Sequence, residues 1–272
     1  MIISASRRTD IPAFYMKWFL QKLKNETVIV RNPFNKNQQK KISLARDDVD
    51  FIVFWTRDAR KLLRNIDELN SYNIPYYVNY TITGYGREVE VNARELDESI
   101  ETIIRLSEKI GKSRIIWRYD PIIISNKINY KWHEDNFTKI LSKTKIYINR
   151  IIISIIDEYR NNKKNLSNIG ILSPTEHINN YNLVVNMIAE NCRVHNVIVQ
   201  SCSEELIPQE IIPAGACIDP SIIYGNIITS RKDHGQRRCC KCYPSIDIGE
   251  YNTCFYGCKY CYATNRIPKK LT

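Results

Sequence analysis

The chain has 272 residues and a formal net charge of +11, with 43% hydrophobic and 25% charged residues. This length suits a single α/β domain with a sizeable core, and the most apolar run, residues 147–156, is too short to cross a bilayer and is interrupted by Asn149 and Arg150. The positive charge is spread along the chain without a basic arm, so it indicates either an anionic partner (nucleic acid, a nucleotide or a phosphorylated small molecule) or a solvated basic surface.

Short β-rich runs alternate with amphipathic segments through the first ~200 residues. We predict strands at residues 2–5, 27–30, 51–55, 76–82, 114–117, 150–156 and 196–200. We predict helices at residues 14–23, 58–69, 93–110, 133–141 and 181–191. Alternation of this kind implies parallel strands joined by crossover helices.

The alternation favours an α/β fold with a (β/α) barrel, full or partial, over residues 1–201. No strand is followed by Gly-x-Gly-x-x-Gly, which weakens an open dinucleotide-binding sheet. After residue 201 the helical periodicity fades and glycine, proline and cysteine become denser. We therefore expect residues 202–272 to form an irregular cysteine-rich extension that binds an iron–sulfur cluster and packs on the barrel mouth.

Polar and charged residues follow almost every predicted strand. They are Ser6, Arg7, Arg8, Asp10, Thr56, Arg57, Asn79, Thr81, Arg118, Asp120, Asp157, Tyr159, Ser201 and Glu204. In parallel α/β folds the carboxyl ends of the strands meet on one side, where active sites form. Loops are polar in any case, but as a set these residues predict one polar cavity.

The chain contains nine cysteines, and six of them fall between Cys239 and Cys261. The N-terminus lacks the order of charge and apolar residues typical of a signal peptide, so we expect a cytoplasmic protein. Disulfides are rare in that reducing compartment, and clustered cysteines there indicate metal binding or catalysis.

The last three cysteines, Cys254, Cys258 and Cys261, have the spacing C-x3-C-x2-C, with the aromatic Tyr260 directly before the last. Three thiolates at this spacing can hold three irons of a 4Fe-4S cluster and leave the fourth iron open. The amino and carboxylate groups of S-adenosylmethionine can chelate the open iron. Transfer of one electron then breaks a sulfur–carbon bond and releases a 5′-deoxyadenosyl radical.

The remaining cysteines leave alternatives open. Cys239, Cys240 and Cys242 could form a zinc site with the later C-x2-C pair, or a second cluster with Cys217 or Cys202. Buried small hydrophobic residues are the simplest interpretation of Cys192, Cys202 and Cys217.

Several motifs resemble a bacterial family of formerly unknown function whose hallmark is a radical-SAM-type cysteine motif at the C-terminus. They are Trp117-Arg118-Tyr119-Asp120-Pro121, Cys217-Ile218-Asp219, Lys232-Asp233, Gln236-Arg237 and Asp247 through Cys254. The resemblance spans nearly the whole chain, and within the family the chain is similar to queuine lyases. It implies a radical S-adenosylmethionine lyase that releases queuine from queuosine 5′-phosphate.

The resemblance also implies partners. We expect a small-molecule nucleotide substrate and an electron donor such as flavodoxin or ferredoxin, and we expect no membrane and no nucleic acid. We expect a mechanism of three steps: a reduced cluster would split S-adenosylmethionine, the adenosyl radical would abstract hydrogen from the substrate sugar, and the sugar radical would expel the base.

We predict that Arg7, Arg8 and Asp10 bind the substrate. The two arginines could clamp a phosphate with paired hydrogen bonds. The alternative is that one of them forms a local ion pair with Asp10.

We predict that Arg118, Asp120, Glu204 and Tyr260 bind the cofactor. Asp120 could accept hydrogen bonds from ribose hydroxyls, because the following Pro121 stiffens the loop and holds the carboxylate in a fixed direction. The alternative is a loop-initiating Asp-Pro, which is a common turn signal. Glu204 could contact the amino group of the methionine moiety.

Two other functions compete with this prediction. One is another radical-SAM reaction with an auxiliary cluster. The other is a zinc-containing nucleic-acid-binding protein, which would bind RNA or DNA in a salt-dependent way.

Overall fold

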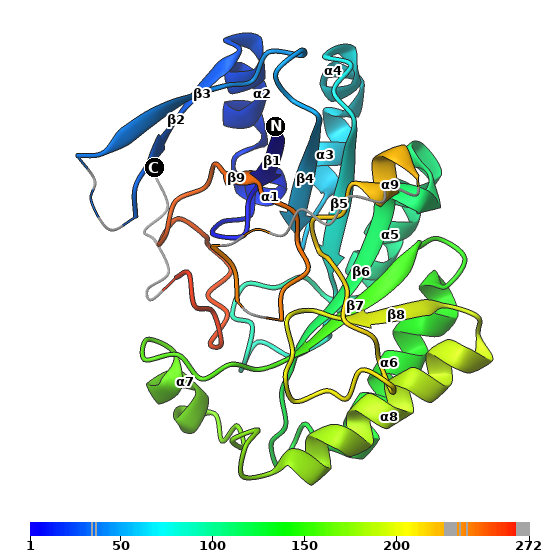
Figure 1. The fold of residues 1–272 in the computed structure, drawn as a ribbon. Helices are drawn as coiled ribbons and strands as arrows, with labels where there is room; N and C mark the ends of the chain where they lie inside the picture. Colours follow the sequence, from blue (N-terminus) through cyan, green and yellow to red (C-terminus); the bar gives the residue numbers. More distant parts are fainter. Residues whose placement is uncertain (34, 36, 226–232, 234, 238, 265–272) are drawn as a thin grey trace.

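The structure is a computed structural model that describes residues 1–33, 35, 37–225, 233, 235–237 and 239–264. Lys232 and Arg238 therefore lie outside the described residues. A parallel sheet of seven strands forms the centre, with the strand order β8-β7-β6-β5-β4-β1-β9. A separate antiparallel hairpin of β2 and β3 stands at one side (Figure 1).

The strands that build the sheet come from both ends of the chain. They are β1 (Ile2–Ala5), β4 (Phe51–Thr56), β5 (Tyr76–Thr81), β6 (Ile115–Ile122), β7 (Arg150–Ile155), β8 (Ile198–Ser201) and β9 (Ile246–Asp247). The hairpin consists of β2 (Thr27–Arg31) and β3 (Gln39–Ser43).

The helices lie mostly in the crossover connections between these strands. They are α1 (Ile11–Phe14), α2 (Met16–Lys24), α3 (Arg60–Arg64), α4 (Ile66–Ser71), α5 (Leu96–Ile110), the 3₁₀ turn η1 (Lys112–Arg114), α6 (Tyr130–Thr144), α7 (Lys163–Asn168), α8 (Ile178–Val194) and α9 (Ser221–Tyr224). None of the helices among the described residues combines the length and apolarity that a membrane crossing requires.

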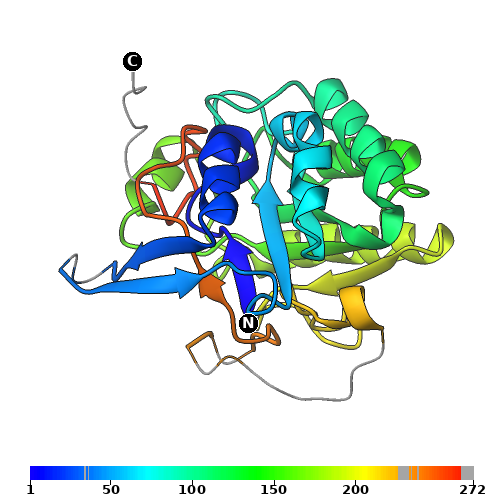
Figure 2. The ribbon, with the colours of Figure 1, turned by 90° about the horizontal axis from the view of Figure 1, so that it is seen from above.

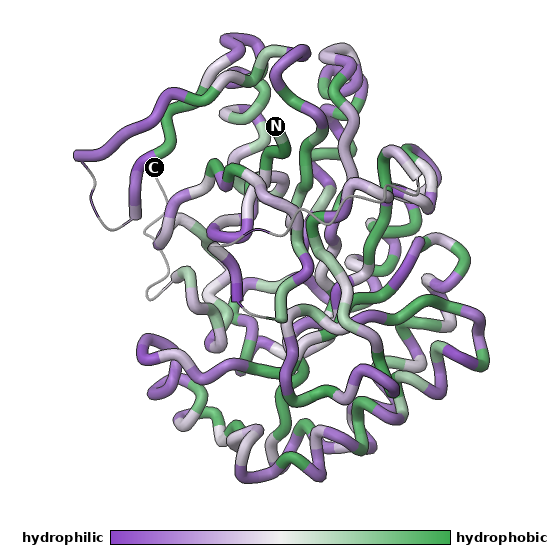
Figure 3. The backbone as a smooth tube through the Cα atoms, in the orientation of Figure 1, coloured by the Kyte–Doolittle hydropathy of each residue, from purple (hydrophilic) through white to green (hydrophobic). Residues whose placement is uncertain are grey.

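Both faces of the sheet are buried. Side chains alternate between the two faces along each strand. In β4, Ile52 and Phe54 point to the helices, and Phe51 and Val53 point to the opposite face. Figure 3 shows hydrophobic residues along the central strands and alternating hydrophobic and hydrophilic residues along α6 and α8. Apolar residues on both faces are typical of a parallel sheet that is covered on both sides.

The predicted (β/α) barrel, full or partial, is wrong, because the sheet is open. β8 and β9 are its two edges, and no pairing joins them among the described residues. A closed barrel needs strand–helix units that continue around the axis. After β8 the described chain supplies only the four-residue α9 and the two-residue β9, so the ring cannot close.

The segment after β8 covers the sheet face that the crossover helices leave open (Figures 1 and 2). The hydroxyl of Tyr77 donates to the carbonyl of Cys217 at 2.8 Å, and the amide of Asp219 donates back to Tyr77 at 2.9 Å. Arg150 on β7 forms an ion pair with Asp219 at 2.6 Å. The extension is thus attached to the middle of the sheet. The boundary that we predict at residue 201 stays a prediction.

Candidate functional site

A cavity of about 690 Å³ lies at the carboxyl ends of the parallel strands. Its walls come from residues that follow β1, β4, β5, β6, β7 and β8, and from the extension. The predicted site residues on its walls are Arg7, Arg8, Asp10, Arg118, Asp120, Tyr260, Cys254, Cys258 and Cys261. Strand ends that are far apart in sequence therefore do meet at one polar cavity, on an open sheet.

The cysteine loop is held against the segment that follows β5. The amide of Asn92 donates to the carbonyl of Tyr256 at 2.9 Å, and the amide of Lys259 donates to the carbonyl of Val89 at 2.9 Å. These backbone hydrogen bonds flank Cys258. The loop is therefore positioned by backbone contacts that do not depend on a bound metal.

A buried ion pair stands directly beside this loop. Arg57, at the end of β4, donates to Glu90 at 2.5 Å, to Thr83 at 2.7 Å and to the hydroxyl of Tyr260 at 2.7 Å. Tyr260 and Thr83 also donate to Glu90, and Glu90 is only 1% exposed. Tyr260 thus binds protein groups through its hydroxyl while it also lines the cavity.

The three thiols of the C-x3-C-x2-C motif lie close enough to influence one another. Burial raises the pKa of Cys254 to about 12 and also raises the pKa of Cys258. The positive charge of Arg57 lowers the pKa of Cys258, whereas the negative charge of Glu90 and the neighbouring cysteines raise it. Without a metal, Cys254 and Cys258 are therefore protonated at neutral pH.

The donor set fits an iron–sulfur cluster in its chemistry, since three cysteines line one cavity beside a cation. Thiolate is the ligand that such clusters require. Within the described residues, however, no group of three or more His, Cys, Asp or Glu side chains is already arranged around a common metal position. The thiols would have to turn toward a common centre when a cluster binds.

Arg7 and Arg8 both line the cavity but are held by different partners. The guanidinium of Arg7 lies 5.4 Å from the ring centre of Trp55, and that of Arg8 lies 5.2 Å from the ring centre of Tyr251. Neither forms the local ion pair with Asp10 that was the alternative interpretation, because no such pair occurs among the described residues. Both guanidinium groups keep donors that a ligand can use.

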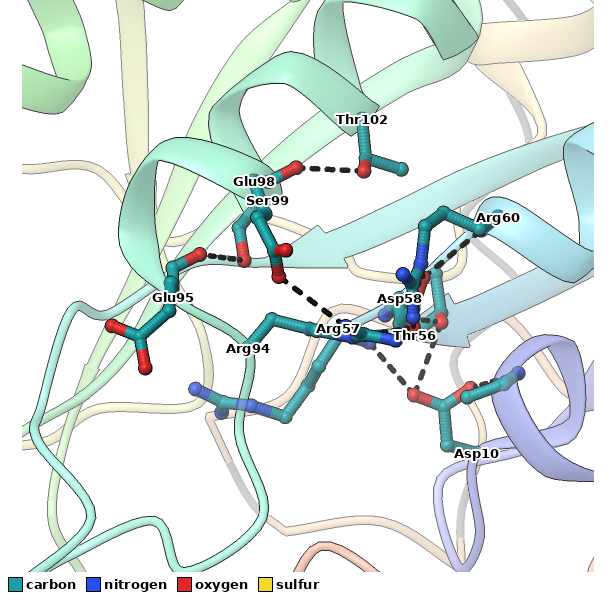
Figure 4. Close-up of polar contacts among 11 residues, drawn as sticks. Asp10, Thr56, Arg57, Asp58, Arg60, Arg94, Glu95, Glu98, Ser99 and Thr102 are labelled. Atoms are coloured by element: carbon teal, nitrogen blue, oxygen red, sulfur yellow. Dashed lines mark hydrogen bonds and ion pairs between the residues drawn. The ribbon is translucent and has the colours of Figure 1, made fainter.

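The carboxylate of Asp10 accepts hydrogen bonds from protein groups at the ends of two elements (Figure 4). One carboxylate oxygen accepts from the amide of Ala13 and caps α1. The other accepts from the hydroxyl of Thr56 at 3.0 Å and from the amide of Arg57 at 2.7 Å. Both oxygens are thus occupied, and Asp10 joins the end of β1 to the end of β4.

Arg118 and Asp120, both within β6, form an ion pair in which Arg118 is buried and Asp120 is partly exposed. Two nitrogens of Arg118 donate to one oxygen of Asp120, and the hydroxyl of Ser154 donates to the other. The guanidinium of Arg118 also stacks on Trp55 at 5.0 Å and donates to the sulfur of Cys217 at 2.7 Å. Asp120 is oriented by these contacts and reaches the cavity wall.

Glu204 is not among the residues that line the cavity. It is 7% exposed, and its Oε1 atom has no hydrogen-bond partner within the described structure. Burial, followed by the charge of Asp157, raises the pKa of Glu204 to about 9. This carboxyl group is therefore neutral at pH 7.

Two residues that we did not predict organise the site: Trp55 lines the cavity, and Glu90 lies outside its lining but pairs with Arg57, which lines it. Trp55 is the penultimate residue of β4, and its ring contacts the guanidinium groups of both Arg7 and Arg118. It looked like part of an apolar strand, and only its position before Thr56 could have indicated the cavity. Glu90 lies in a loop with no motif, so no sequence pattern indicated that it pairs with Arg57.

Comparison with known proteins identifies a family for this chain but no individual related protein. The profile of DUF1848, described as a domain of unknown function, matches residues 2–263. No curated protein and no solved structure matches the chain.

Proposed function

The chain belongs to the DUF1848 family, and we propose that it is a radical S-adenosylmethionine enzyme whose 4Fe-4S cluster is bound by Cys254, Cys258 and Cys261. The finer proposal is a lyase that releases queuine from queuosine 5′-phosphate. That substrate rests on the resemblance of the motifs described above.

One observation supports the proposal most. The C-x3-C-x2-C thiols line the same cavity as the polar residues at the ends of the parallel strands. A cluster there would stand beside the space available to a substrate, which radical transfer between the two requires. At about 690 Å³, the cavity has the size of sites that bind nucleotide-sized ligands.

When bound, the cluster and S-adenosylmethionine supply one electron and a 5′-deoxyadenosyl radical. The protein has to keep three thiolates ionised in a buried place. Arg57 contributes to this, because its positive charge lowers the pKa of Cys258. Glu90 and Tyr260 fix the guanidinium in that position.

The substrate side of the cavity offers cations for an anionic group. The Arg7 and Arg8 guanidinium groups line the wall, and each stacks on an aromatic ring. Stacking restricts the side chains while their donors remain available. A phosphorylated nucleoside supplies both an anion for the arginines and a sugar for hydrogen abstraction.

The first experiment tests the enzyme class. Protein reconstituted anaerobically with iron and sulfide, then reduced with dithionite, is expected to bind about four irons at this motif and to convert S-adenosylmethionine into 5′-deoxyadenosine. Cys258→Ala should abolish both, and Cys192→Ala, at a buried cysteine on α8, should abolish neither. Retention of full iron content and 5′-deoxyadenosine formation in Cys258→Ala would refute the proposal.

The second experiment tests the substrate. Queuosine 5′-phosphate is added to the active protein with an electron donor such as flavodoxin or ferredoxin, and queuine is measured by mass spectrometry. Formation of 5′-deoxyadenosine without queuine would keep the enzyme class and reject the substrate.

A further inference from the structure

Four other cysteines, Cys202, Cys217, Cys240 and Cys242, also line the cavity and lie close to one another. The sulfur atoms of Cys217 and Cys202 are 3.0 Å apart. The amide of Cys217 donates to the sulfur of Cys242 at 3.2 Å, and the amide of Cys242 donates to the sulfur of Cys240 at 3.4 Å. Cys217, Cys240 and Cys242 are at most 6% exposed. None of the four belongs to the C-x3-C-x2-C motif.

Two arginines stand beside these four thiols. Arg118 donates to the sulfur of Cys217 at 2.7 Å. The charge of Arg7 interacts with Cys217 and Cys242, and its Nη2 atom is buried without a hydrogen-bond partner within the described structure. Burying a guanidinium group beside neutral thiols costs free energy, because the group loses its hydration. A nearby negative charge compensates for that loss. Arg118 has Asp120 as a counter-charge. The charge of Asp247 acts on Arg7, but the buried Nη2 of Arg7 has no hydrogen-bond partner within the described structure.

We propose that Cys202, Cys217, Cys240 and Cys242 bind one zinc ion as four thiolates, at a site separate from that of the proposed cluster. Four thiols lose four protons to solvent, and the resulting zinc tetrathiolate has a net charge of −2. Arg7 and Arg118 provide the positive charge beside it. The inference does not depend on radical chemistry, since it concerns other cysteines.

The spacing of the sulfurs favours a single ion over a second cluster. Zinc–sulfur bonds of about 2.3 Å in a tetrahedron place neighbouring sulfurs about 3.8 Å apart. A 4Fe-4S cube binds its cysteines on four different irons, so its sulfurs stand considerably farther apart. The 3.0 Å between Cys202 and Cys217 needs an opening of under about 1 Å for zinc. This need to open agrees with the absence of a ready-formed metal group among the described residues.

Each ligand is attached to the fold by backbone or neighbouring contacts. The amide of Cys202 donates to the carbonyl of Ile153 on β7 at 2.8 Å. The carbonyl of Cys217 accepts from Tyr77 and Asn79 on β5. The adjacent Cys239 is excluded from the set, because its sulfur lies 3.4 Å from Glu205.

Metal analysis tests the inference without any measurement of activity. Protein is produced with zinc in the medium and no iron reconstitution, and zinc is counted by mass spectrometry. We expect about one zinc per chain in the wild type, in Cys192→Ser and in the triple variant Cys254→Ala, Cys258→Ala, Cys261→Ala. Cys217→Ser and Cys242→Ser should each lose at least nine tenths of it.

Cobalt substitution in the wild-type protein covers the case in which a cysteine variant fails to fold. Cobalt in the same site should give the intense visible bands of a tetrahedral tetrathiolate. These bands should disappear when one equivalent of zinc is added.

Three results would overturn the inference. The first is a wild-type protein that contains no zinc and shows no cobalt bands. The others are a Cys202–Cys217 disulfide in anaerobically purified protein, and iron with sulfide bound at these four cysteines in the triple variant. Loss of the cluster in the triple variant with zinc retained separates this site from the proposed enzyme function.

Discussion

Glu90→Gln isolates the contribution of the buried charge beside the cysteine loop. Glu90 is 1% exposed and accepts from Arg57 at 2.5 Å, from Thr83 at 2.7 Å and from Tyr260. The amide has nearly the same shape and can still accept a hydrogen bond, but it leaves Arg57 buried without its counter-charge. Removal of one partner of a buried pair costs about 3–5 kcal/mol, and because the amide keeps an acceptor we expect about 3 kcal/mol.

Thermal unfolding measures this loss. An unfolding entropy of about 2.1 cal/mol/K per residue gives about 0.6 kcal/mol/K for a chain of this length, so 3 kcal/mol lowers Tm by about 5 °C. Glu98→Gln is the matched control, since Glu98 pairs with Arg94 at 3.3 Å and the two side chains are 53% and 39% exposed. Its expected effect is within about 0.5 kcal/mol, or under 1 °C. Equal shifts in the two variants would refute the reasoning.

Three further substitutions test residues in and around the cavity. In the folded protein the pKa of Glu204 is about 9, against an ordinary value of 4.5. Between these two pH values the folded state therefore binds one more proton than the unfolded state, and the free energy of unfolding falls as the pH rises. Glu204→Gln should remove that fall, which is at most about 1.4 kcal/mol per pH unit; parallel pH profiles from denaturant unfolding would contradict the assignment. Tyr260→Phe should cost about 1–2 kcal/mol of stability, because Arg57 and Glu90 lose a shared partner, while the iron bound after reconstitution is unchanged. Under the proposed function, Arg8→Ala should raise KM for queuosine 5′-phosphate about tenfold or more and leave 5′-deoxyadenosine formation without substrate unaffected, as steady-state kinetics would show.

The strands of the sheet were largely predictable from the sequence. The predicted strand at residues 2–5 coincides with β1 (Ile2–Ala5), and that at 150–156 ends one residue beyond β7 (Arg150–Ile155). β6 (Ile115–Ile122) is longer than the predicted 114–117, because it continues past Pro121 with a shift in register. Local patterns identify apolar strand centres, but neighbouring strands decide where a strand ends.

The closure of the sheet was not predictable, because alternation of strands and helices is common to barrels and open sheets. The loss of helical periodicity after residue 201 was the relevant signal. Among the described residues only α9 and the two-residue β9 follow β8, and β9 pairs with β1 at the edge of the sheet.

Strand-end polarity predicted the location of the cavity but not what each residue does there. Asp10 stands at a strand end as expected, yet both its oxygens serve α1 and β4. Glu204 follows β8 as expected, yet it does not line the cavity. Sequence position determines which end of a strand a residue occupies, whereas the direction of its side chain depends on packing.

The open sheet and the cysteine content have one physical cause in common. A closed barrel fills its interior with side chains from its own strands. Here the corresponding face is covered by the extension, whose Cys217, Cys240 and Cys242 pack against Val53 and Tyr77. The same folding-back brings the C-x3-C-x2-C loop to the strand ends. One segment of the chain therefore both covers the open face of the sheet and carries the two groups of thiols to the cavity, where all seven line the wall.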